Sequence, residues 1–206
     1  MAPKVVTGPV TADELLMLPD DGVRHELRRG ELTTVVPPGY RHGRVVAAIA
    51  ARLERHVAAQ RLGHVLAGDP GFKLSSDPDT VRGPDVAFVA QARVDAVGVP
   101  DGFWPGPPDV AIEVVSPGDS YSDLQEKALE WLTADTRLVL VVDPRRRTVT
   151  AYRSPDRIVE LSTGQLLDAS DGVPGWSIPV EELFGDGGRR RPGEAGPPAQ
   201  GAARRR

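Results

Sequence analysis

Apolar residues recur at helical spacing in two long segments of the chain. In residues 41–61, positions such as Val45, Ile49 and Leu53 fall on one face, which predicts an amphipathic helix. Residues 120–133 repeat this pattern and predict a second helix. Near the N-terminus, Thr11 and Glu14 have the spacing of a capping box, so a short helix is expected to start there.

Shorter segments of alternating or continuous apolar residues predict β-strands around these helices. Residues 24–36 are expected to form a hairpin that turns at Arg29-Gly30. The proline-rich residues 91–108 are expected to form a loop, with at most one helical turn near Val94. Single strands are predicted at residues 64–67, 72–74, 85–89, 110–115, 137–142, 148–153 and 157–161.

The order of these elements predicts an α/β fold of the α+β kind. A mixed, largely antiparallel sheet with helices packed on it is expected, because strands and helices do not alternate regularly. The 206 residues suit one domain with two tails. We expect a flexible N-terminus at residues 1–10, a domain at residues 11–184, and a disordered, solvated tail rich in Gly, Pro and Arg at residues 185–206.

The composition limits the cellular compartment that is expected for the chain and the kinds of metal site that it can form. The absence of cysteine excludes disulfides and thiolate metal sites and fits a cytoplasmic protein. The apolar runs are too short to cross a bilayer, and no apolar signal region follows Met1, so neither a membrane anchor nor secretion is expected.

Charge is unevenly distributed along the chain. The net charge is −4, and residues 185–206 carry +4, which leaves −8 on the rest. An acidic body argues against non-specific binding of nucleic acid, since phosphate contacts supply most of that affinity. Three basic clusters offset this argument, and an acidic metal site would itself contribute negative charge. The clusters are Arg24/Arg28/Arg29, Arg41/Arg44 and Arg145/Arg146/Arg147.

Glu113 lies within an otherwise apolar strand. Side chains alternate along a strand, so Glu113 shares a face with Ala111 and Val115. A buried carboxylate needs a cation, a metal or hydrogen bonds. The alternative is an edge strand with Glu113 in water, which the apolar residues on both faces disfavour.

Asp85 opens another short strand, after Gly83-Pro84. If this strand pairs antiparallel with that of Glu113, the two carboxylates meet at one end of the sheet. Two converging carboxylates form an oxygen site suited to Mg²⁺ or Mn²⁺. Taken alone, Asp85 is equally well explained as a turn or capping residue.

Lys127 falls within the apolar stripe of the helix at residues 120–133. It lies three positions after Leu124 and four before Trp131. Such a lysine either extends its ammonium to the edge of the stripe or points at negative charge. Beside a metal it would position or deprotonate a water and stabilise charge on a phosphate.

A series of motifs, in this order, resembles the Uma-type putative restriction endonuclease family, which belongs to the PD-(D/E)XK nuclease-like superfamily. The resemblance covers residues 11–184, and no single motif carries it alone. The motifs are His25-Glu-Leu-Arg-Arg-Gly-Glu-Leu32, Arg41-His42, Gly83-Pro-Asp-Val86, Ile112-Glu-Val-Val-Ser-Pro117, Asp123 to Lys127, Leu140-Val-Val-Asp-Pro144 and Val173-Pro-Gly-Trp-Ser-Ile-Pro-Val180.

The resemblance implies a restriction-endonuclease-like core in which Asp85 and Glu113 bind the metal. The superfamily usually has a lysine two residues after the second carboxylate, where this chain has Val115. Lys127 matches the family's helix lysine and would supply the ammonium from the other side. Glu26 matches an early acidic residue that would orient a water or a second metal.

Two of these residues have ordinary alternative explanations. Glu26 is equally well explained as a hairpin glutamate paired with Arg24 or Arg28. His42 also matches a family position, where it would contact a phosphate or cap the helix.

These observations lead to two main hypotheses. The first is a Mg²⁺- or Mn²⁺-dependent endonuclease that cuts DNA, with Asp85, Glu113, Lys127 and Glu26 at the site and arginines of the hairpin with Arg41 and Arg44 on the backbone. Cutting both strands of a duplex would call for a homodimer. The second is a non-catalytic nuclease-fold protein that binds nucleic acid or regulates a partner. A hydrolase of another phosphoester is a third, weaker alternative.

Overall fold

The computed structural model describes residues 8–19 and 22–185, and within them the strands form three sheets. The largest sheet has the order β11-β10-β9-β8-β6-β3, a second has the order β2-β1-β5-β4-β7, and β12 pairs with β13. The strands are β1 Arg24–Arg28, β2 Glu31–Val35, β3 Gly63–Ala67, β4 Phe72–Ser75, β5 Thr80–Arg82, β6 Val86–Ala90, β7 Trp104–Pro105, β8 Val110–Val114, β9 Leu138–Asp143, β10 Thr148–Ser154, β11 Arg157–Ser162, β12 Leu166–Asp168 and β13 Ser177–Pro179.

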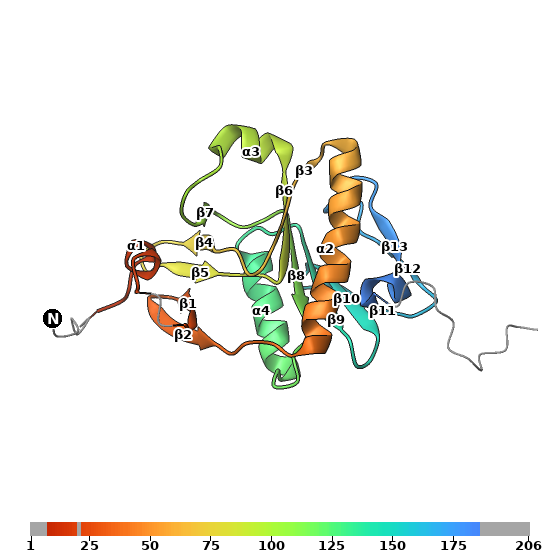
Figure 1. Ribbon diagram of the computed structural model, residues 1–206, viewed down its shortest axis with the longest axis horizontal. Helices are drawn as coiled ribbons and strands as arrows, with labels where there is room; N and C mark the ends of the chain where they lie inside the picture. Colours follow the sequence, from red (N-terminus) through yellow and green to blue (C-terminus); the bar gives the residue numbers. More distant parts are fainter. Residues whose placement is uncertain (1–7, 20–21, 186–206) are drawn as a thin grey trace, which may run out of the picture.

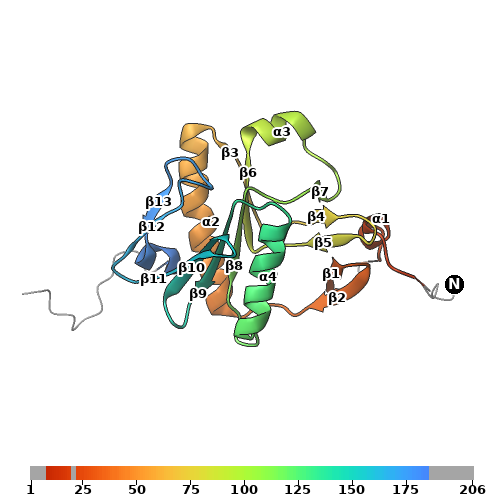
Figure 2. The same cartoon turned by 180° about the vertical axis from the view of Figure 1, so that it is seen from behind.

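Two long helices cover opposite faces of the six-stranded sheet, α2 in front in Figure 1 and α4 in front in Figure 2. The core under α2 includes Ile49 and Ile112, and the core under α4 includes Ala111 and Trp131. Neighbouring residues of β8 thus face different cores, as strand alternation predicts. The helices are α1 Ala12–Leu16, α2 Tyr40–Gln60, α3 Gln91–Val97, α4 Tyr121–Thr133 and the 3₁₀ helix η1 Val180–Phe184.

Local sequence signals account for the ends of several elements. The capping box of Thr11 and Glu14 is formed, and the Ser120 side chain caps α4 by accepting from the amide of Asp123. Arg29 and Gly30 both have positive φ, of 50° and 81°, as a two-residue hairpin turn requires. The predicted capping box and hairpin turn are therefore confirmed.

The pairing of β6 with β8 positions the two carboxylates. The strands run antiparallel with Val86 opposite Ile112 and Ala87 opposite Ala111. One further step along this register sets Asp85, just before β6, opposite Glu113. The sheets are mixed, since β8 pairs parallel with β9 while most other pairs are antiparallel. The predicted mixed, largely antiparallel architecture is confirmed.

Several predictions about local structure need correction. Residues 91–108 are not only loop, because α3 and β7 lie within them. The strands β5, β12 and β13 were not predicted, since each has only three residues and no pattern to reveal it. Val10, within the segment expected to be flexible, is buried and donates its amide to Gly30 at 2.8 Å. The expectations for residues 1–7 and 186–206 lie outside the described residues.

Candidate active site

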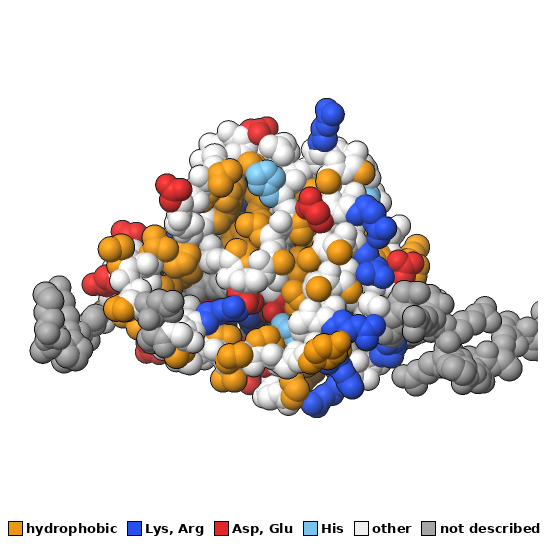
Figure 3. Space-filling model, viewed as in Figure 1, with side chains coloured by type: hydrophobic (Ala, Val, Ile, Leu, Met, Phe, Trp, Pro, Cys, Tyr) orange, Lys and Arg blue, Asp and Glu red, His pale blue; other side chains and the backbone are white. Residues whose placement is uncertain are grey.

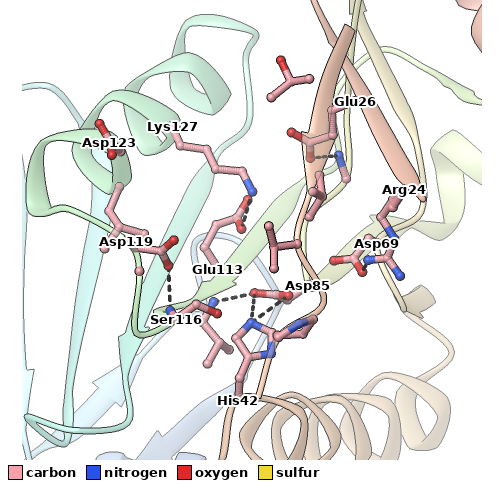
Figure 4. A pocket seen from close by; sticks show the side chains of 18 of the residues that line it. Arg24, Glu26, His42, Asp69, Asp85, Glu113, Ser116, Asp119, Asp123 and Lys127 are labelled. Carbon is pink, nitrogen blue, oxygen red and sulfur yellow. Dashed lines mark hydrogen bonds and ion pairs between the residues drawn. The ribbon is translucent and has the colours of Figure 1, made fainter. Parts of the chain in front are cut away.

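A cavity of about 810 Å³ opens where the two larger sheets meet. Its wall comes from the β1–β2 hairpin, the start of α2, the segment before β6, the end of β8 and the first half of α4. Figure 3 shows a hollow in which acidic side chains lie beside a histidine, and Figure 4 shows the residues around it. The lining includes all four predicted site residues, Glu26, Asp85, Glu113 and Lys127, together with His42.

Glu113 is buried at the floor of this cavity and is 5% exposed. Its Oε2 accepts a hydrogen bond from the ammonium of Lys127 at 2.8 Å. Its Oε1 accepts one from the indole N–H of Trp131, also at 2.8 Å. Lys127 and Trp131 are four positions apart on α4, so one helix face supplies both donors.

Burial is the main influence on the protonation of Glu113. Removal from water raises the pKa of Glu113 to about 7, the charge of Lys127 opposes this rise, and the charge of Asp85 adds to it. A carboxyl group with such a pKa exchanges its proton near neutral pH. Perturbed groups of this kind occur often at functional sites.

Lys127 keeps its charge despite being largely buried. Burial by itself would lower the pKa of Lys127, but the carboxylates of Glu113 and Glu26 outweigh it and raise the pKa. The ammonium is therefore bonded to Glu113 and is also attracted by the charge of Glu26, which belongs to the other sheet. The side chain points into the cavity between them (Figure 4).

Asp85 is fixed by the backbone and by a histidine. Its Oδ2 accepts from the amide of Val114 at 2.6 Å, which joins the segment before β6 to the end of β8. The Nε2 of His42 lies 3.1 Å from both carboxylate oxygens of Asp85. Because a carboxylate only accepts, Nε2 carries the hydrogen. The other ring nitrogen, Nδ1, is buried and has no hydrogen-bond partner among the described residues.

The Gly83-Pro84-Asp85 segment requires glycine at its first position. A Cβ on Gly83 would lie 2.8 Å from the backbone oxygen of Asp69, so a side chain would displace the segment. The amide of Gly83 donates to Glu26 Oε1 at 3.0 Å. The glycine thus allows the close packing that holds Asp85 at the cavity.

Glu26 lines the cavity but both of its oxygens have partners. Besides Gly83, it binds the guanidinium of Arg82 at 2.5 Å, and Arg82 also pairs with Glu130. The expected partners differ from these, because Arg24 pairs with Asp69 and Arg28 with Glu126 and Glu130. Residues distant in sequence determine these pairs, and a hairpin pattern does not reveal them.

Three features of the site were missed or only partly anticipated from sequence. Trp131 was assigned to the apolar stripe alone, although its i, i+4 spacing from Lys127 was a usable signal. The contact of His42 with Asp85 spans 43 positions and has no local signal. Val115 packs on the α4 side of the sheet, as alternation predicts, and also lines a small cavity beside the site.

Metal ligands are limited in number. Within residues 8–19 and 22–185 no group of three or more His, Asp or Glu side chains is arranged to hold a metal ion. Asp85 and Glu113 supply two carboxylates, and their oxygens keep lone pairs beyond the hydrogen bonds named above. Mg²⁺ commonly uses one or two protein carboxylates, with water and substrate phosphate as the remaining ligands. The donor set therefore fits such an ion.

The comparison with protein families agrees with the resemblance that the sequence motifs carry. The family model of Uma2, described as putative restriction endonuclease, matches residues 12–181. The chain belongs to this family. No curated protein matches it.

A solved structure shares the fold. It is described as a putative nuclease belonging to DUF820 from Anabaena variabilis ATCC 29413. The two chains are 21% identical and superpose with a TM-score of 0.73, over 86% of this chain and 98% of the other. At this identity the similarity shows the fold alone. No helix among the described residues has the length and apolar character needed to cross a membrane.

Proposed function

We propose that the chain is an endonuclease that hydrolyses phosphodiester bonds of DNA with Mg²⁺ or Mn²⁺ held by Asp85 and Glu113. The observation that carries the proposal is the meeting of three groups at the floor of one cavity. Glu113 lies 2.8 Å from the ammonium of Lys127, and Asp85 stands across an antiparallel strand pair from it. Family membership supplies the class of reaction.

A divalent ion at these carboxylates would supply Lewis-acid chemistry, which polarises the scissile phosphate and lowers the pKa of a bound water. Asp85 and Glu113 have different environments for this task. Asp85 is oriented by the amide of Val114 and by His42, whereas Glu113 is oriented by Lys127 and Trp131. Ligands fixed in this way lose little freedom on binding.

Lys127 is the group that would assist attack on the phosphate. Its side chain is 25% exposed and points into the cavity, and the neighbouring carboxylates favour its charged form, so it can stabilise negative charge that develops on phosphate oxygens. From α4 it replaces the lysine for which the superfamily uses the position of Val115. Glu26 and His42 act as positioning residues in this proposal, through Gly83 and Asp85 respectively.

The decisive experiment is cleavage of plasmid DNA by the Lys127→Ala protein with Mg²⁺ or Mn²⁺, with EDTA as the metal-free control. Removing a charge aligned with the phosphate is expected to lower the rate at least about a hundredfold. Lys73→Ala is the matched control, because Lys73 pairs with Asp79 away from the cavity. Thermal unfolding shows whether each variant is folded. Full metal-dependent cleavage by Lys127→Ala would rule out this role.

A non-catalytic nucleic-acid-binding or regulatory protein is the second candidate. Two observations favour it: valine stands at position 115, and residues outside 185–206 carry a net charge of −8. This candidate predicts salt-sensitive DNA binding with no metal-dependent nicking by the wild-type protein. For the nuclease, cleavage of both strands of a duplex would call for two sites and thus for a homodimer, which analytical ultracentrifugation would detect.

A further inference from the structure

Most arginines around the cavity are already neutralised by acidic side chains. Arg24 pairs with Asp69, Arg28 pairs with Glu126, and Arg82 is enclosed by Glu26 and Glu130. A guanidinium that is committed to a carboxylate has fewer donors left for a phosphate. The hairpin arginines are therefore poor candidates for holding a nucleic-acid backbone, although the sequence pattern suggested them.

The arginines of the turn between β9 and β10 also differ in whether their guanidinium groups have partners. Arg146 binds Glu160 through two hydrogen bonds of 3.1 Å, and the guanidinium of Arg147 lies 4.7 Å from the ring centre of Phe184. Arg145 is exposed, and its guanidinium has no partner in the described part of the chain. Its backbone is nevertheless ordered, because Asp143 accepts from the amides of Arg145 and Arg146.

Arg41 also lines a cavity beside the site and is exposed, and its guanidinium has no partner within residues 8–19 and 22–185. Its neighbour Arg44 differs, because it donates to the backbone oxygen of Gly185 at 3.0 Å. Arg41 lies in the first turn of α2, where there is no acidic residue and where Gly39 provides no side-chain cap. The positive end of the helix dipole thus adds to the charge of Arg41.

Arg41 and Arg145 line one small cavity of about 40 Å³ beside the candidate active site. Gly39, His42 and Pro117 line both this cavity and the larger one. The two arginines therefore flank the site on the side of α2 and of the β9–β10 turn. In Figure 3, Lys and Arg side chains gather over the lower end of α2, next to the hollow.

We infer that Arg41 and Arg145 form a phosphate-binding subsite that holds a backbone phosphate of the nucleic-acid substrate next to the scissile bond. The inference rests on the proposed function, since it assigns the substrate path of the same site. Guanidinium groups bind phosphate oxygens through paired N–H donors, and neither arginine must first release a carboxylate. The substrate backbone accordingly runs from the larger cavity past Pro117, and not along the hairpin.

The test measures binding of a fluorescently labelled DNA duplex by anisotropy, with Ca²⁺ in place of Mg²⁺ and with the duplex checked to be intact. The variants are Arg41→Ala, Arg145→Ala and the double variant. Arg146→Ala is the matched control, because it removes the same charge one position away. Both target arginines are exposed and without partners, so their loss should leave thermal unfolding nearly unchanged.

The double variant is expected to bind about tenfold more weakly than wild type and to show a smaller dependence on salt. Each lost phosphate contact lowers the slope of log affinity against log salt by about 0.9. Scanning a neutral methylphosphonate linkage through the duplex should weaken wild type at one or two positions. The same linkage should leave the DNA affinity of the double variant unchanged.

The outcomes separate this inference from the proposed function. If wild type binds and cleaves DNA but the double variant binds no worse than Arg146→Ala, the subsite is wrong and the nuclease proposal stands. If wild type neither binds nor cleaves DNA, both are wrong. A loss that is confined to Arg41 and Arg145 variants and follows one neutral linkage supports the subsite.

Discussion

The pKa of Glu113 makes binding of a divalent ion depend on pH in the neutral range. Proton and metal compete for the same carboxylate oxygens, so the apparent affinity follows the ionised fraction of Glu113. With a pKa of about 7, roughly one molecule in eleven is ionised at pH 6 and roughly ten in eleven at pH 8. Affinity for Mn²⁺ should therefore rise about tenfold between these pH values.

Isothermal titration calorimetry with Mn²⁺ between pH 5.5 and 8.5 measures this dependence. Three variants assign it to Glu113. Lys127→Met removes a charge that lowers the pKa of Glu113, so the midpoint should move to higher pH. Asp85→Asn removes a charge that raises the pKa, so the midpoint should move down while binding weakens. His42→Gln removes the imidazole bonded to Asp85, and the dependence should persist without it.

A carboxylate with its usual pKa, near 4.3 for glutamate, would be ionised throughout this range. An affinity for Mn²⁺ that is constant from pH 6 to pH 8 would thus refute the reasoning that burial dominates at Glu113. A dependence that vanishes in His42→Gln would assign the effect to the histidine instead.

Three further predictions concern the groups around the two carboxylates. In metal-free protein, ionisation of Glu113 destabilises the folded state, because its pKa is raised there; this destabilisation is absent below pH 4.5 and complete above about pH 7. A rise in pKa from 4.5 to about 7 corresponds to about 3 kcal/mol. The free energy of unfolding of Glu113→Gln, measured by chemical denaturation, should therefore increase relative to wild type by about that much between pH 4.5 and pH 7. His42→Leu should weaken Mn²⁺ binding about 10–100-fold and His42→Gln should restore much of it, whereas equal affinities in calorimetry would show that His42 does not orient Asp85. Glu26→Gln should lower the free energy of unfolding by about 3 kcal/mol, because it breaks the buried pair with Arg82, while cleavage per folded molecule falls little; complete loss of cleavage in a stably folded Glu26→Gln protein would instead make Glu26 catalytic.

Local sequence patterns predicted the direction in which the side chains of the site point. Alternation along β8 placed Glu113 and Ile112 on opposite faces of the sheet. The helical period placed Lys127 on the face of α4 that packs against the sheet. The antiparallel pairing needed to bring Asp85 to Glu113 was a hypothesis, and the register of β6 with β8 confirms it. The side-chain directions follow from the repeat of a strand or a helix, which can be read within a single segment of the sequence.

The sequence by itself therefore determined the two long helices, the hairpin, the mixed sheet and the directions of Glu113 and Lys127. Only the tertiary structure decided which partner each charged group has: His42 for Asp85, Arg82 for Glu26, and no described partner for the guanidinium groups of Arg41 and Arg145. The physical reason is that side-chain direction depends on neighbours a few positions away. Charge pairing depends instead on distances between segments, which are set when the two larger sheets pack together and the cavity forms between them.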